Sequence, residues 1–218
     1  MGVIMAVKMQ TFDSREEWLK ERGSRIGGSD AACLLGLNPW KSNVQLFREK
    51  LNPETVKEID NEAMAYGRAA EPIIRELFKL DHTDIKVCYL ENNIWTDNRY
   101  PFAHASLDGW WTADEQVQGV LEIKMVTIRN RIQAQEWEDR IPNNYYCQVL
   151  WYMMVTGAKE AWLTALMHWH DGREEVRDYH IDRNADVEAD IKILADAGEK
   201  FWNALREGKE PPLILPSV

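Results

Sequence analysis

The segment 119–125 constrains the fold of this chain more than any other stretch. It is a short apolar run interrupted by two charges, Glu122 and Lys124. Side chains alternate across a β-strand, so both charges project from one face while Leu121, Ile123 and Met125 project from the other. Glu and Lys are seldom buried unless they are paired. The pattern predicts a strand with one apolar face and one face whose charged side chains have a functional role.

A second carboxylate, Asp108, lies upstream in a segment near enough to form the neighbouring strand. Carboxylates with a few waters suit Mg²⁺. Asp108, Glu122 and Lys124 could together carry out phosphodiester hydrolysis, because a metal activates its bound water while a lysine orients the nucleophile. Two other interpretations remain open here, namely a hairpin turn at Asp108-Gly109 and a solvated edge strand carrying Glu-x-Lys.

Length and charge bound the class of protein. With 218 residues, of which 45% are hydrophobic, the sequence predicts one globular domain over 1–218, with a Pro-rich tail at 209–218. The formal net charge of −10 argues against a generally basic nucleic-acid-binding surface. Any DNA contact would then be confined to one locally basic region.

Cysteine and hydropathy patterns indicate the compartment. Cys33, Cys88 and Cys147 are odd in number and lack CxxC spacing, which favours reduced thiols. No signal-peptide pattern and no apolar run of membrane-spanning length is present in the sequence, so we expect a cytoplasmic protein without a membrane partner. His168 and His170 share a strand face, but a zinc site is disfavoured without a third ligand nearby.

The segment Gly27-Gly28-Ser29 precedes a short helix expected at 31–35. Ser29 is expected to cap that helix, and the free amides, the hydroxyl and the helix dipole would form an anion site for a phosphate. An ordinary turn with an N-cap is the alternative. Trp40, in the following loop, is expected to be a core anchor, with stacking on a base as the alternative.

The remaining periodicity predicts groups of helices and groups of strands. Helix 61–80 contains Pro72, which would bend it unless the helix begins at that proline. Strands at 84–90 and 93–96 would form an antiparallel meander with the Asp108 and Glu122 segments. The other expected helices are 14–22, one capped by Ser42 and Gln45 that ends at Lys50, 129–138, 143–155 and 185–206, and the other strands are 161–169 and 174–181.

The order of five motifs resembles the lambda-type phage exonucleases and YqaJ-like viral recombinases, nucleases of the PD-(D/E)XK superfamily. The motifs span about residues 18–157, and their order is far more specific than any one of them alone. They are Trp18 through Asp30, Gly36 through Trp40, Gly67 through Pro72, Ala105 through Gly109 with Leu121 through Lys124, and Tyr145 through Gln148. The resemblance implies an α/β fold with a restriction-endonuclease-like core, in which helices flank a mixed central sheet.

The same resemblance implies a metal site. Mg²⁺, with Mn²⁺ as a substitute, would be held by Asp108, Glu122 and the Ile123 carbonyl, with Lys124 near the attacking water. Glu71 would assist a second metal position or its water. Gln148 matches the family glutamine that reaches into the site.

A 5′-phosphate site is implied as well, formed by Arg22, Ser29 and Ser106, with Arg25 as a competing choice for the arginine. Leu107 stands where the superfamily name has proline before the aspartate, a position that many members relax. The Cas4-like branch is excluded, because it needs four cysteines for an iron–sulfur cluster.

By resemblance, the chain would degrade one strand of linear double-stranded DNA from a 5′ end. A ring-shaped homotrimer, a single-strand annealing partner and a phage or prophage origin are implied too. Two alternatives remain, a structure-specific DNA endonuclease on the same scaffold and a catalytically inactive DNA-binding assembly module.

Overall fold

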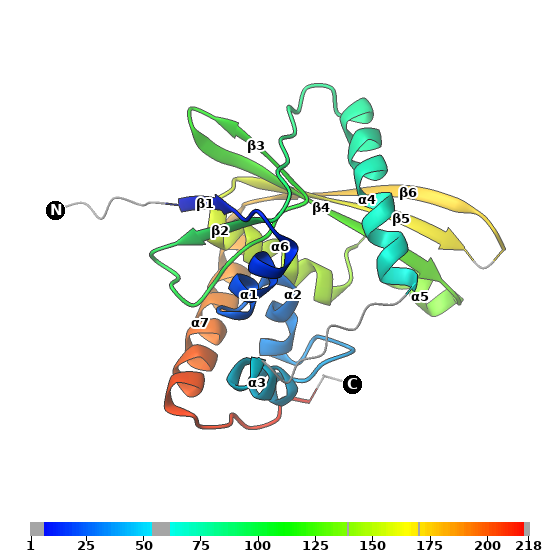
Figure 1. Cartoon of the computed structure of the whole chain (residues 1–218). Helices are drawn as coiled ribbons and strands as arrows, with labels where there is room; N and C mark the ends of the chain where they lie inside the picture. Colours follow the sequence, from blue (N-terminus) through cyan, green and yellow to red (C-terminus); the bar gives the residue numbers. More distant parts are fainter. Residues whose placement is uncertain (1–6, 54–61, 139, 170, 216–218) are drawn as a thin grey trace.

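The computed structural model describes residues 7–53, 62–138, 140–169 and 171–215 (Figure 1). Helices and strands come in successive groups along the chain. The helices are α1 (Arg15–Gly23), α2 (Gly28–Ala31), the 3-10 helix η1 (Ala32–Leu35), α3 (Asn43–Leu51), α4 (Glu62–Asp81), α5 (Arg131–Glu136), α6 (Asn143–Thr156) and α7 (Ala185–Glu207).

The central sheet has the strand order β3-β4-β5-β6. Its strands are β3 (Gly109–Ala113), β4 (Gln116–Ile128), β5 (Glu160–Trp169) and β6 (Glu174–Asp182). The β4–β5 pair is parallel, and the β3–β4 and β5–β6 pairs are antiparallel, so the predicted mixed sheet is confirmed. Because β4 is an interior strand, the solvated-edge interpretation of Glu122 and Lys124 is wrong.

The two faces of β4 belong to different layers. On one face, Leu121 and Ile123 pack against Ile74 and Phe78 of α4. On the other face lies the larger core around α6, in which every residue from Cys147 to Thr156 is buried. In Figure 1, α4 crosses the sheet, while α1, α2, α3 and α7 gather below it. The predicted separation of charged and apolar faces on β4 is confirmed.

Local capping explains where several helices begin. The Ser14 hydroxyl accepts a hydrogen bond from the Glu17 amide at 3.2 Å, which starts α1. Ser42 and Gln45 form the expected capping box of α3. Pro72 lies inside α4, so that helix does not begin at the proline. The predicted start at Asn61 lies outside the described residues.

Two strand predictions differ from the structure. Residues 84–90 form no strand and contribute only a single bridge between Cys88 and Trp110. In addition, β2 (Asn93–Asp97) pairs with β1 (Val7–Thr11) in a separate two-stranded sheet, and not with the central sheet. The predicted antiparallel pairing of the Asp108 and Glu122 segments and the strand at 93–96 are confirmed. The four-strand meander is wrong, because an alternating sequence becomes a strand only where a partner edge is available.

All three cysteines are free, as predicted. Within the described ranges, no helix combines the length and apolar character needed to cross a lipid bilayer. The tail at 209–215 packs back on α3, where the Asn43 amide nitrogen donates to the Pro212 carbonyl at 2.8 Å.

Candidate active site

Asp108 is held in place by a buried amide clamp. The side chain of Asn93 donates to the Leu107 carbonyl at 2.9 Å and accepts from the Leu107 amide at 2.9 Å. The Asp108 carboxylate then accepts from the Ile123 amide at 2.8 Å, which ties it to β4. Gly109 begins β3, and a Cβ there would lie 3.2 Å from the Leu121 Cβ, so close strand packing accounts for the glycine. The hairpin-turn interpretation is wrong.

Glu122 and Lys124 lie together on the α6 side of β4. The Lys124 ammonium contacts Glu122 Oε1 at 2.5 Å. Gln148 of α6 donates to the same Oε1 at 2.7 Å and to the Tyr152 hydroxyl oxygen at 2.8 Å. Both donors therefore converge on one carboxylate oxygen. The other oxygen, Glu122 Oε2, is buried without a hydrogen-bond partner in the described structure.

Glu71 reaches the site from α4 through an arginine that the sequence analysis did not select. Arg75, one turn further along the helix, pairs with the Glu71 carboxylate and donates from Nε to the Asp108 carbonyl at 2.6 Å. Its guanidinium lies 3.5 Å from the centre of the Tyr89 ring, a cation–π contact. Arg75 thus links α4 to the loop that carries Asp108.

Crowding perturbs the acids of this cluster. Burial raises the pKa of Glu122 to about 8, and the Asp108 carboxylate adds to the rise. Burial and Asp108 also raise the pKa of Glu71 to about 7, against the opposing effect of Arg75. The pKa of Asp108 is raised by burial, although Lys124 opposes it. Burial disfavours the Lys124 ammonium, but the Glu122 and Asp108 carboxylates outweigh it and raise the pKa of Lys124.

These features fit a divalent cation. Asp108, Glu122 and Glu71 lie near enough to act on one another's pKa values, and buried Glu122 Oε2 has no donor among the described residues, a cost that proteins seldom leave uncompensated. An all-oxygen set of this kind suits Mg²⁺ or Mn²⁺ better than a soft metal. Asp108, Glu122 and Glu71 are the side chains that would hold it, and the Ile123 carbonyl stays a predicted ligand.

The residues predicted to bind a 5′-phosphate lie partly together. Ser106 Oγ donates to the Asn93 carbonyl at 2.8 Å, and Trp18 Nε1 donates to the same oxygen at 3.1 Å. Arg22 lies over the Trp18 ring, 4.3 Å from its centre. Burial lowers the pKa of His104 to about 3, and the nearby positive charge of Arg22 adds to that decrease. Arg22 and Ser106 therefore flank one small region.

The Gly27-Gly28 turn packs against that region. A Cβ on Gly27 would meet the His104 ring at 2.8 Å, and one on Gly28 would meet the Tyr152 ring at 2.3 Å, so both positions require glycine. A β-bridge joins Ile26, next to this turn, to Ala103, three residues before Ser106, and so holds the turn close to the Ser106 segment. Tyr152 then connects the turn to Gln148 and the acids.

The role expected for Ser29 as a helix cap is wrong. Gly27 is the N-cap residue of the four-residue α2, and its amide donates to the Asp30 carboxylate at 3.2 Å. One of the expected free amides is therefore occupied. Ser29 is exposed in the first turn and, within the described chain, makes no hydrogen bond.

The choice between Arg22 and Arg25 has a structural basis. Arg25 forms an ion pair with Glu21, one helical turn before it. Within the described residues, Arg22 pairs with no carboxylate, and its guanidinium lies over the Trp18 ring. Its guanidinium hydrogen-bond donors are therefore available, which favours Arg22 as the anion ligand.

The structure also brings in aromatic residues that were not assigned to the site. The Lys124 ammonium lies 5.2 Å from the centre of the Tyr145 ring. Trp40, expected in the core, is instead 71% exposed, and its ring centre lies 6.3 Å from that of Tyr145. The helical stripe containing Tyr145 was visible in the sequence, but its neighbours on β4 and in the Trp40 loop were not.

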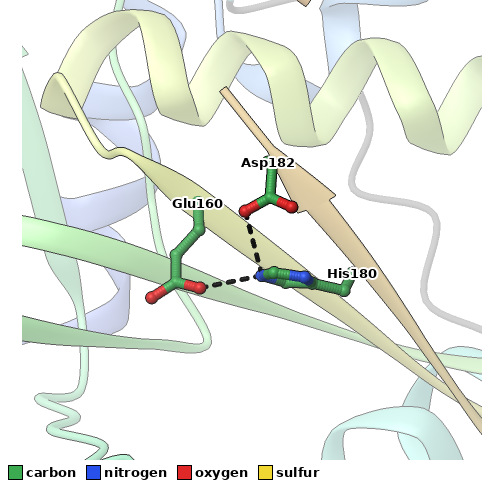
Figure 2. Close-up of side chains that lie close together, drawn as sticks. All are labelled: Glu160, His180 and Asp182. Carbon is green, nitrogen blue, oxygen red and sulfur yellow. Dashed lines mark hydrogen bonds and ion pairs between the residues drawn. The ribbon is translucent and has the colours of Figure 1, made fainter. Parts of the chain in front are cut away.

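A second acidic cluster lies on the opposite face of the sheet. Glu160 faces Asp182 across β5 and β6, and Figure 2 shows His180 between the two carboxylates. His180 Nε2 lies 2.8 Å from a Glu160 oxygen and 3.8 Å from an Asp182 oxygen. The other Glu160 oxygen accepts from Trp111 Nε1 at 3.2 Å. These groups are partly exposed, and each Glu160 oxygen has a hydrogen-bond donor. The cluster is therefore a surface network whose hydrogen-bonding groups satisfy one another.

Of the zinc pair considered from the sequence, only His168 lies within the described residues. Its Nδ1 lies 2.9 Å from a Glu174 carboxylate oxygen across the β5–β6 hairpin. His170 lies outside the described residues. A histidine paired with a neighbouring carboxylate is an ordinary feature of a half-buried strand pair.

The fold and the spacing of acids define the class. A mixed sheet flanked by helices, with Asp108 before one strand and Glu122-x-Lys124 within the next, has the fold of solved exonuclease structures. Residues 17–159 match the YqaJ-like viral recombinase domain, and the chain belongs to this family.

Three relatives illustrate the similarity. The uncharacterized protein YqaJ of Bacillus subtilis strain 168 is 31% identical over 204 residues, covering 92% of this chain and 59% of its own length. The chain thus spans less than two thirds of that relative. The alkaline exonuclease LHK-Exo of Laribacter hongkongensis, solved with dAMP, superposes with a TM-score of 0.66 at 19% identity, over 88% of this chain and 93% of its own. A phage-related exonuclease of Haemophilus somnus gives 0.55 at 12% identity, over 87% and 98%.

Proposed function

We propose that this protein is a Mg²⁺-dependent 5′-to-3′ exonuclease acting on linear double-stranded DNA. It degrades one strand from a 5′-phosphorylated end and leaves a 3′ single-stranded overhang for phage-type homologous recombination. The observation that carries the proposal is the arrangement around Glu122, beside Asp108. Gln148 and Lys124 contact Oε1, and buried Oε2 has no donor among the described residues. The exonucleases among the structural neighbours support the reaction class.

Each side chain of the cluster has a distinct task in this proposal. A divalent cation held by the carboxylates would supply Lewis-acid chemistry, lowering the pKa of a water and offsetting charge on the phosphate. Lys124, whose pKa is raised by the neighbouring acids, stays protonated and donates to the attacking water or a phosphate oxygen. Gln148 orients Glu122, and Arg75 holds Glu71 against the Asp108 loop.

Binding of a 5′-phosphate by Arg22, Ser29 and Ser106 would account for dependence on DNA ends. Arg22 supplies a guanidinium that pairs with no carboxylate of the described residues, and the Ser106 hydroxyl oxygen can still accept a hydrogen bond. The pair Arg22→Gln and Arg25→Gln is a matched comparison, because both remove one positive charge from the same segment. Only Arg22→Gln should slow a 5′-phosphorylated duplex more than a 5′-hydroxyl duplex.

Further parts of the proposal rest on the family. We propose that the elements from β1 to α7 act as one nuclease domain within a homotrimer that encircles DNA. A ring would reconcile the net charge of −10 with DNA binding, because only the channel needs to be basic. The proposed protein partner is a single-strand annealing protein. The proposed location is the cytoplasm of a bacterial host that carries phage DNA.

The decisive assay uses linear duplex DNA with a 5′-phosphate on one strand only, beside the same sequence as a closed circle, with Mg²⁺. Loss of the phosphorylated strand from its 5′ end, with circles intact and Lys124→Ala inactive, is the expected outcome. Cut circles would replace the proposal by the endonuclease alternative. Binding without any hydrolysis would replace it by the inactive assembly module.

A further inference from the structure

Trp40 is unusual among the tryptophans of this chain. All ten tryptophans lie within the described residues, and the indole of Trp40 alone is exposed, at 71%. Burying such a large apolar ring normally contributes to stability. An exposed indole contributes little to the fold, so its position needs another explanation.

The loop that carries Trp40 is held in one conformation. The Asn38 side-chain oxygen accepts from the amides of Trp40 and Lys41, at 2.9 and 3.0 Å. The Lys41 ammonium is paired with Glu49 of α3 at 2.5 Å. The indole is therefore presented to solvent by a fixed backbone, and little conformational entropy would be lost if a ligand covered it.

The surroundings of the indole lead to the proposed active site. The aromatic ring in contact with it is Tyr145, with ring centres 6.3 Å apart and planes at 48°. Tyr145 in turn lies 5.2 Å from the Lys124 ammonium. Since stacked nucleotides advance roughly 3.4 Å each along a strand, the indole lies within about three nucleotides of a phosphate held at Lys124.

We propose that Trp40 is a positioning residue that stacks on a base of the strand being cut, one to three nucleotides from the scissile phosphate. This inference rests on the proposed function, because it assumes that a DNA strand occupies the Lys124 site. Every base offers a π face, so an aromatic platform positions a strand without reading its sequence. That property suits an enzyme that must act on successive nucleotides.

The test couples a protein change to a base deletion. A set of 5′-phosphorylated duplexes carries a single abasic residue at each of the first four positions of the cut strand. Dissociation constants are measured by fluorescence anisotropy with Ca²⁺ in place of Mg²⁺, and gels check that the DNA stays intact. The variants are Trp40→Ala, Trp40→Phe and, as a control of equal 71% exposure nine residues beyond Glu71, Leu80→Ala.

For the unmodified protein, we expect one abasic position to weaken binding about 10-fold, the usual effect of losing one stacked base. Trp40→Ala should bind intact DNA about 10-fold more weakly and be indifferent to that abasic position. Trp40→Phe and Leu80→Ala should behave like the unmodified protein. Unchanged thermal melting of Trp40→Ala, expected for an exposed side chain, would separate this loss from misfolding.

Two results would overturn the inference. One is unchanged binding of intact DNA by Trp40→Ala, and the other is an abasic effect in that variant equal to that in the unmodified protein at all four positions. Parallel digestion of the intact duplex with Mg²⁺ distinguishes the two levels of failure. If the protein digests DNA but shows no coupling, only the role of Trp40 is refuted. If the protein neither digests nor binds DNA, the proposed function is refuted together with the role of Trp40.

Discussion

The two acidic clusters of this protein lie on opposite faces of one sheet and differ in how their oxygens are satisfied. Around Glu122, burial and Asp108 raise carboxyl pKa values, and one buried oxygen has no donor in the part of the chain that the structure describes. Around Glu160, His180 and Trp111 supply a donor to each oxygen. Proximity of acids alone does not make a site. The first cluster differs from the second because it contains a buried carboxylate oxygen that no described donor or cation contacts.

The largest contrast should appear in hydrolysis. Glu122→Gln keeps the shape of the side chain and the contact with Gln148 but removes the charge that would hold a cation. We expect strand degradation to fall about 1,000-fold or more, since electrostatic stabilisation of this kind is a dominant part of such catalysis. Glu160→Gln, the matched change in the second cluster, should leave the rate near that of the unmodified protein. The measurement is nucleotide release from 5′-phosphorylated linear duplex.

Comparable rates for Glu122→Gln and Glu160→Gln would remove the distinction between the clusters. A large loss for Glu160→Gln alone would move the site to the other face of the sheet.

Arg75 provides the next contrast, now in stability. Its guanidinium is the buried partner of Glu71 and of the Asp108 carbonyl. Arg75→Met keeps most of the aliphatic length but leaves Glu71 without its cation, and we expect the free energy of unfolding to fall by about 3 kcal/mol. Urea denaturation measures it. Arg75→Lys should recover only part of the loss, because an ammonium cannot make both contacts in the same planar geometry.

A loss below about 1 kcal/mol for Arg75→Met would be typical of an exposed ion pair and would contradict the linking role given to Arg75.

Local pattern accounts for what the sequence could predict. Alternation along β4 placed Glu122 and Lys124 on one face, and capping boxes placed α1 and α3, because these signals reside in a few neighbouring residues. Arg75 was missed because its contact with the Asp108 carbonyl joins residues far apart in sequence. The pairing of β1 with β2 was missed for the same reason.

Competition between local signals explains two errors. Ser29 has a good capping side chain, but the Asp30 carboxylate takes the Gly27 amide and starts the helix two residues earlier. Trp40 was expected in the core because large aromatic residues usually are buried. Its exposure depends on the shape of a loop fixed by Asn38, which periodicity does not report. The metal and phosphate roles themselves stay predictions.

The dependence of stability on pH should separate the clusters further. Glu122, with a pKa near 8 when folded and an ordinary value of 4.5, binds a proton in the folded state that the unfolded chain releases. Without metal, this group therefore favours folding at low pH, and its contribution is lost as the pH rises from about 4.5 to about 8. The melting temperature of Glu122→Gln relative to the unmodified protein should increase across that window.

Adding Mg²⁺ at pH 8 should raise the melting temperature of the unmodified protein and of Glu160→Gln by several degrees, since about 1 kcal/mol corresponds to roughly 2–4 °C in a chain of this size. Glu122→Gln should respond little. An equal Mg²⁺ response in Glu122→Gln would mean that the cation binds elsewhere.

The smallest effect is expected in the second cluster. His180 lies against Glu160, stacks on the Trp162 ring at 4.5 Å and sits on a partly exposed strand pair. His180→Gln keeps a donor within reach of Glu160 and loses only part of the ring contact. We expect a change of about 1 kcal/mol or less in the free energy of unfolding, with no change in hydrolysis or in the Mg²⁺ response. Urea denaturation and the nucleotide-release assay measure both. If His180→Gln instead abolished the Mg²⁺ response, the cation site would be the exposed histidine and its two carboxylates. The buried Glu122 carboxylate would then be neutralised by a proton and not by a cation.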